Sequence, residues 1–249
     1  MMARAAYKGL LCLALAASLQ ADTVVLGNPP MVGTGNCDPF GCPNFLGLNT
    51  YQQVYLSTAF PGSIAISGLT FYEGQVVDAP LPAGGTYTLS FSYTSFNPGD
   101  LNLVNPGNNI GPGSQTFFAG TLPPMTSEGP AGAYLVIDGT PFVYNPADGN
   151  LLLTVTVTGG TDAVPTLFLN EAACGPKTAC PPGSTVVSSN AYFAEVNSAP
   201  VSGGNDVGGL VTGFTYTPLT VPEPASLLLV LAGIGLCAAG RARRRLPHA

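Results

Sequence analysis

The 249-residue chain combines few charges with many turn-forming residues: charged side chains make up 8% of it, beside 32 Gly and 24 Pro. Its ten Tyr and twelve Phe distinguish it from disordered segments, which are usually charged and poor in aromatic residues. Between Asp22 and Val221, twelve acidic residues and one basic residue, Lys177, give a formal charge of −11. This charge argues against a nucleic-acid-binding protein, and the composition predicts a folded, turn-rich β protein.

The N-terminus has the layout of a secretory signal peptide. Arg4 and Lys8 precede the apolar run 10–19, and small residues follow up to Ala21. A basic segment, a short apolar segment and a small-residue cleavage site are the three parts of such a peptide. We therefore predict a signal helix over residues 1–21, which directs the chain to the Sec export machinery and is removed after Ala21.

Three stretches of the body alternate apolar and hydroxyl residues: TYTLSFSYT (86–94), LLLTVTVT (151–158) and GFTYTPL (213–219). Alternation of this kind predicts strands with one buried and one solvated face. Weaker strand candidates are 53–57, 63–66, 69–73, 116–119, 134–138, 166–170 and 191–196. Turn-forming pairs lie between them, and Asp138-Gly139 suggests a hairpin turn.

Eight to ten short antiparallel strands with frequent turns predict an all-β fold, a β-sandwich of jelly-roll type. No long helical stretch is expected outside the two termini. We predict one domain over residues 22–218, between the signal peptide and a C-terminal tail over 219–249.

Four of the six cysteines lie in the body, as the pairs Cys37/Cys42 and Cys174/Cys180. In an exported protein an even number of cysteines predicts disulfides. Because turn-forming residues separate each pair, we favour the local bonds 37–42 and 174–180, although three pairings are open. A zinc site made from the four thiolates is the alternative, but the spacings C-x4-C and C-x5-C differ from the usual structural zinc pairs.

The body lacks the residues for most catalytic sites. Its sequence contains no His, since the only one is His248, so Ser-His and Cys-His arrangements are excluded. Two carboxylates could hydrolyse a glycoside, with candidates among Glu73, Asp78, Glu128, Asp138, Glu171 and Glu195. Most of these lie beside turns, where acidic residues are common, so we expect no enzyme.

Binding functions remain open. Asp100, Asn102, Asp148 and Asn150 offer oxygens to calcium, although their spacing is not that of an EF-hand. Asx turns are the simpler interpretation of these residues. A sugar-binding platform of aromatic rings is a further alternative. In the clearest strands, however, the rings share a face with Leu, which favours core packing.

The C-terminus begins with Pro222, Glu223 and Pro224. Sixteen uncharged residues follow over 225–240, and then come Arg241, Arg243, Arg244 and Arg245. A helix of sixteen residues is about 24 Å long, short for a hydrocarbon core of about 30 Å, but snorkelling arginines can compensate. The positive-inside rule keeps the arginines cytoplasmic and the body outside. We predict a transmembrane helix over 225–240.

Pro-Glu-Pro, a short apolar helix and an arginine-rich end, in this order, resemble the PEP-CTERM sorting signal of exported bacterial proteins. The resemblance implies that an exosortase, an integral membrane protease, recognises the tail and cuts near Pro222–Pro224. Proline on both sides keeps Glu223 in an extended segment, as a protease cleft requires. A plain tail anchor is the alternative.

Together these features predict an exported, non-enzymatic protein of the cell envelope or the extracellular polysaccharide matrix. It would start as a precursor anchored in the inner membrane and reach the surface or matrix after cleavage of the tail. The alternative is a glycan- or calcium-dependent binding module or adhesin on the same β-sandwich.

Overall fold

The computed structural model describes residues 21–27, 35–41, 48–72, 85–125, 134–159, 169–170, 188–196, 199–202 and 209–219, with only the backbone given for 35–36, 48, 134, 169–170, 188–196 and 199–202. The chain divides into two units, Met1–Pro218 and Leu219–Ala249. Except for Ala21, the predicted signal helix (1–21) lies outside the described residues. The predicted transmembrane helix (225–240) lies outside them as well. Within the described residues, no helix has the length and apolar character needed to cross a membrane.

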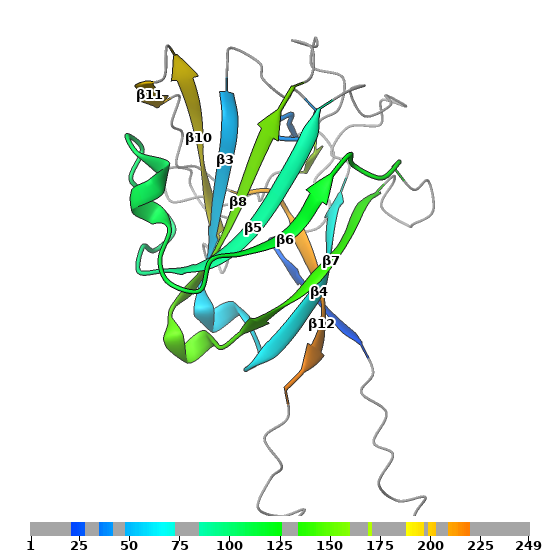
Figure 1. The fold of residues 1–249 in the computed structure, drawn as a ribbon. Coiled ribbons are helices and arrows are strands. Elements are labelled where there is room, and N and C mark those ends of the chain that lie inside the picture. Colours follow the sequence, from blue (N-terminus) through cyan, green and yellow to red (C-terminus); the bar gives the residue numbers. More distant parts are fainter. Residues whose placement is uncertain are drawn as a thin grey trace, which may run out of the picture. The chain divides into compact units, whose positions relative to one another are not determined.

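Two antiparallel sheets pack as a sandwich (Figure 1), which confirms the all-β prediction. The four-stranded sheet has the order β1 (Asp22–Leu26), β12 (Thr212–Pro218), β4 (Ile64–Tyr72) and β7 (Tyr134–Tyr144). The six-stranded sheet has the order β11 (Ala199–Ser202), β10 (Ser188–Val196), β3 (Leu48–Tyr55), β8 (Asn150–Thr158), β5 (Thr86–Thr94) and β6 (Gln115–Gly120). Two short strands, β2 (Gly35–Asn36) and β9 (Leu169–Asn170), pair with each other.

Alternation along the strands decides which side chains enter the core. On β5 the side chains that enter the core are Tyr87, Leu89 and Phe91, and on β8 Val155 and Val157 occupy the same face. The opposite sheet contributes Ile66, Leu69, Phe71, Leu135, Ile137 and Phe214. Aromatic rings connect the layers, with ring centroids 5.0 Å apart for Tyr55 and Phe214 and 5.3 Å apart for Phe91 and Phe142. Each such side chain contributes about 1.5–3 kcal/mol by burial.

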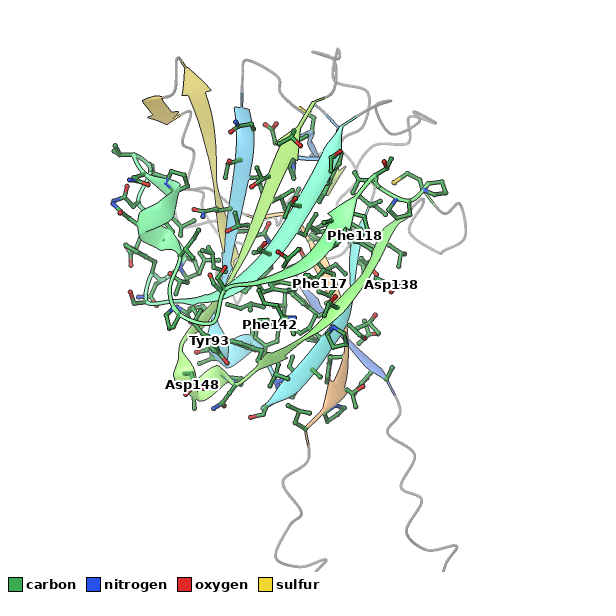
Figure 2. All side chains as sticks on the ribbon, in the orientation of Figure 1. Tyr93, Phe117, Phe118, Asp138, Phe142 and Asp148 are labelled. Carbon is green, nitrogen blue, oxygen red and sulfur yellow. The ribbon has the colours of Figure 1, made fainter. Side chains whose placement is uncertain are left out.

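Three short 3-10 helices lie in the connections: η3 (Ser57–Ala59), η4 (Pro106–Asn109) and η5 (Pro146–Asp148). The chain turns between β7 and β8, where η5 leads into Gly149, whose φ of 136° suits glycine. Figure 2 shows Asp148 at this turn, well away from Asp138 in the middle of β7.

The prediction of a hairpin turn at Asp138-Gly139 is wrong. β7 runs through both residues as one strand from Tyr134 to Tyr144. Gly139 serves close packing instead, because a Cβ at this position would collide with the backbone oxygen and ring of Phe117. Glycine in a strand interior commonly marks such a close approach.

The two strands expected at 63–66 and 69–73 are likewise one strand, β4. The pairing of β4 with β7 shifts register between Ile66 and Gly68, so an irregularity takes the place of the expected break. Gly68 allows this path, since a Cβ there would approach Asp138 Oδ1 to 3.1 Å and Thr215 Cβ to 3.2 Å. Such an irregularity bends a strand without ending it.

Candidate functional site

The predicted sorting residues, Pro222–Pro224 and the arginines Arg241, Arg243, Arg244 and Arg245, lie outside the described residues. The structure does describe the strand to which they are attached. β12 ends at Pro218, and Leu219 follows with 39% of its surface exposed. The end of β12 is therefore the part of the body that precedes the tail in the chain.

β12 is paired on both sides, with β1 and with β4. Its partner β1 begins at Asp22, the residue that follows the predicted signal-peptide cleavage site. The two strands are antiparallel and pair Asp22 with Tyr216. The first residue expected in the mature chain and the last strand before the tail thus lie side by side.

A polar contact joins this pair of residues. The Tyr216 hydroxyl donates to Asp22 Oδ2 at 3.3 Å, while Asp22 Oδ1 accepts the backbone N–H of Thr23 at 2.8 Å. Burial raises the pKa of Tyr216, and the charge of Asp22 and its hydrogen bond raise it further. The phenol therefore stays protonated and remains a donor at neutral pH.

Buried polar groups connect β3 with the residues leading into β12. Gln53, which is 0% exposed, donates from Nε2 to the oxygen of Leu210 at 2.8 Å. Its Oε1 accepts the backbone N–H of Leu210 at 2.8 Å and the hydroxyl of Tyr51. The amide of Gln53 therefore makes the two hydrogen bonds to the Leu210 backbone that a neighbouring strand would otherwise make. In the sequence, Gln53 is distinguished only as one of two adjacent glutamines in a strand.

Three of the residues considered for calcium, Asn102, Asp148 and Asn150, accept hydrogen bonds from other protein groups. Asn102 Oδ1 accepts the backbone N–H groups of Val104 and Asn105, each at 2.9 Å. Asn150 Oδ1 accepts the N–H of Ser57 at 2.8 Å, and Asp148 Oδ2 accepts from Asn145 Nδ2 at 3.0 Å. No group of three or more His, Cys, Asp or Glu within the described part of the chain could hold a metal. The contact of Asn102 with the N–H of Val104 is an Asx turn, whereas Asn150 bonds a distant segment of the chain.

The structure describes the side chain of one of the six candidate carboxylates of a glycosidase. Asp138, on β7, is the member of the group whose side chain is described. Glu73, Asp78, Glu128 and Glu171 lie outside the described residues, and only the backbone of Glu195 is given. Lys177, the one basic residue between Asp22 and Val221, lies outside the described residues as well.

Cys37 is disulfide-bonded, while Cys42, Cys174 and Cys180 lie outside the described residues. The backbone turns directly after Cys37, where the N–H of Gly41 donates to its oxygen at 2.5 Å. Such a turn favours the bond to Cys42, but the β2–β9 pairing also sets Asn36 opposite Leu169, near the second cysteine pair in sequence. The local pairing therefore stays a prediction. Within the same turn, burial raises the pKa of Asp38 to about 6.

A comparison with protein families matches residues 220–245 to the PEP-CTERM protein-sorting motif. The chain ends in a PEP-CTERM tail. The match begins two residues after the end of β12 and includes Pro222–Pro224 and all four arginines. A PEP-CTERM tail implies export and processing by an exosortase. No curated protein and no solved structure matches the chain.

Proposed function

We propose that this chain is an exported, non-enzymatic protein of the cell envelope or extracellular matrix whose PEP-CTERM tail is cut by an exosortase. The observation that carries the proposal is the position of the motif, residues 220–245, directly after the last strand of the body. Only Leu219 separates Pro218 from the matched residues, so the body ends where the sorting signal begins.

The charge distribution supports the route to the surface. Basic residues are concentrated at the two ends of the sequence, and the segment from Asp22 to Val221 carries a formal charge of −11, twelve acidic residues less Lys177. Arginines that follow an apolar segment are retained on the cytoplasmic side. The precursor is thus anchored in the inner membrane with its body outside, and cleavage releases the body to the cell surface or matrix.

The strand order supports a jelly-roll scaffold. Without β2, β9, β10 and β11, eight of the twelve described strands remain. When these eight are renumbered 1 to 8 along the chain, the strand order is 1-8-3-6 in one sheet and 2-7-4-5 in the other. Eight strands in two sheets of this kind form a jelly roll. The fold by itself implies no activity, and the lack of His in the body sequence supports a non-enzymatic role.

A second candidate function is a glycan-binding module on the same scaffold. Its support is the outer face of the six-stranded sheet, which bears hydroxyl side chains in register across several strands. A calcium-dependent version has less support, since the side-chain oxygens of Asn102, Asp148 and Asn150 already accept hydrogen bonds from protein groups.

Replacing the motif in the native host tests the sorting proposal. We expect Glu223→Ala, and the double variant Pro222→Ala/Pro224→Ala, to accumulate as an uncut precursor in the membrane fraction. Ser226→Ala, outside the Pro-Glu-Pro sequence, is the matched control and is processed like the wild type. Equal processing of all these variants, or unchanged processing in a host without its exosortase, would refute the proposal.

A further inference from the structure

The outer face of the six-stranded sheet carries hydroxyl side chains in rows that run across the strands. Pairing sets Thr156 between Thr50 and Thr88 in one row. The next row has Thr154 beside Ser90, which pairs with Thr116 on β6. A third row pairs Thr158 with Thr86. The eight residues therefore form an array of four strands, and each row spans neighbouring strands.

The array has a regular spacing. Neighbouring strands lie about 4.8 Å apart, and residues on the same face of one strand repeat about every 6.7 Å. Thr86, Thr116 and Thr158 are exposed, and the other five residues are half-buried between their neighbours. Since threonine is stiff at χ1, the hydroxyls are held in place more firmly than those of longer side chains.

The face is uncharged where it is described. The outward positions of β3, β5, β6 and β8 whose side chains are described carry Thr, Ser, Asn, Gln, Ala, Val or Leu. In an average soluble protein about 25% of the residues are charged. A neutral face on a body with a formal charge of −11 suits a neutral ligand, because a polyanion meets overall repulsion.

The loop between β5 and β6 covers one end of the face, next to the array. Gln52 anchors this loop: its Nε2 donates to the oxygen of Pro106 at 3.1 Å, and its Oε1 accepts from Asn109 Nδ2 at 2.8 Å. Beneath the loop, Leu101 packs on Val54 and Leu152. The same Nε2 lies 3.2 Å from Thr154 Oγ1, so the row of Thr154 begins at the edge of the fixed loop.

We propose that this hydroxyl array, Thr50, Thr86, Thr88, Ser90, Thr116, Thr154, Thr156 and Thr158, is a binding face for a neutral polysaccharide chain. Each hydroxyl is one donor and two acceptors, as is each hydroxyl of a sugar, and a repeating ligand meets several of them at once. Single contacts of this kind are weak, but their number along one chain multiplies the effective affinity. The inference rests on the proposed export of the body, which brings it to such polymers.

Affinity electrophoresis tests the proposal with the full chain in a neutral detergent. Native gels contain hydroxyethyl cellulose, dextran, the anionic polymer alginate, or no polymer. We expect retardation by at least one neutral polymer and none by alginate. Thr88→Val/Thr156→Val, which removes two neighbouring hydroxyls, loses this retardation, and Thr88→Ser/Thr156→Ser retains it. Thr70→Val/Thr217→Val, on the four-stranded sheet, is the matched control and migrates like the wild type.

Equal retardation of the Thr88→Val/Thr156→Val variant and the wild type, at matching melting temperatures, would overturn the proposal. No retardation by either neutral polymer, or stronger retardation by alginate, would overturn it as well. Because the assay uses the unprocessed chain, its result is independent of tail cleavage. A processed protein that binds neither neutral polymer refutes this inference alone, whereas a binding protein with an uncut tail refutes the sorting proposal alone.

Discussion

Asp22 and Tyr216 stand opposite each other in the β1–β12 ladder, and the Tyr216 hydroxyl donates to Asp22 Oδ2 at 3.3 Å. Asp22 is the expected first residue of the mature chain, and Tyr216 lies two residues before the end of β12. The pairing fixes both ends of the body to one edge region of the four-stranded sheet. A strand that starts at the expected cleavage site therefore completes the core rather than forming a loose end.

The contribution of β1 can be measured at its last residue. Leu26 is 5% exposed and belongs to the core cluster, whereas the neighbouring Val25 is 37% exposed. We expect Leu26→Ala to lower the free energy of unfolding by about 2–4 kcal/mol, because it leaves a cavity. Val25→Ala, the control, costs less than about 1 kcal/mol. Denaturant unfolding of both variants checks this, and equal effects would show that β1 is not part of the core.

Gln53 binds the backbone of Leu210, two residues before β12 begins. Gln53→Leu leaves the backbone N–H and oxygen of Leu210 without the partner that they have in the structure. We expect a loss of about 2–4 kcal/mol in the free energy of unfolding, since each orphaned buried group costs about 1–3 kcal/mol. Gln115→Leu is the control, because the amide of Gln115 donates to the Pro141 oxygen at an exposed site. A Gln53→Leu variant as stable as Gln115→Leu would contradict this role.

Two tyrosines of the core should respond in opposite ways to loss of the hydroxyl. Tyr87 is 2% exposed and its hydroxyl has no hydrogen-bond partner among the described residues, while the Tyr55 hydroxyl lies 2.9 Å from Thr212 Oγ1. We expect Tyr87→Phe to leave stability unchanged or raise it by up to about 1 kcal/mol, and Tyr55→Phe to cost about 1 kcal/mol. Thermal melts of the two variants provide the measurement. A clear loss of stability in Tyr87→Phe would show that its hydroxyl is bonded after all.

Stability should depend on pH through Asp38. Burial raises the pKa of this carboxyl from 3.8 to about 6 in the folded state, so the folded state binds the proton more tightly than the unfolded state. The contribution of Asp38 is therefore most favourable below pH 4 and is lost as the pH rises towards 6. The loss is at most about 3 kcal/mol, and less because the side chain is partly exposed.

Comparison with Asp38→Asn isolates this effect from the other acidic residues. We expect the difference in unfolding free energy between the variant and the wild type to shift in favour of the variant between pH 4 and pH 6. Denaturant titrations at several pH values measure the difference. A constant difference over this interval would mean that Asp38 titrates with an ordinary pKa in the folded protein.

The sequence predicted those elements whose local pattern decides their structure. β5 and β8 follow the alternation of Tyr87, Leu89 and Val155 with hydroxyl residues, because one face of each strand must enter the core. The tail was predictable for a different reason, since its three parts are contiguous in the chain.

What the sequence could not predict depends on contacts between distant segments. Gly139 looks like a turn residue, and only the approach of Phe117 makes it a strand residue. Gln52 and Gln53 are adjacent, yet one fixes a loop on the outer face and the other bonds Leu210 in the interior. Neither partner could be assigned from spacing, because 54 and 157 residues separate these groups in the chain.

The decisive measurement is the intact mass of the protein recovered from the native host's envelope and medium. We expect a mass that lacks residues 1–21 and also the tail beyond about Pro224, with any additional mass on the new C-terminus indicating transfer to a surface acceptor. A mass that retains residues 225–249 in all fractions would contradict cleavage by an exosortase, and the tail would then be an ordinary membrane anchor.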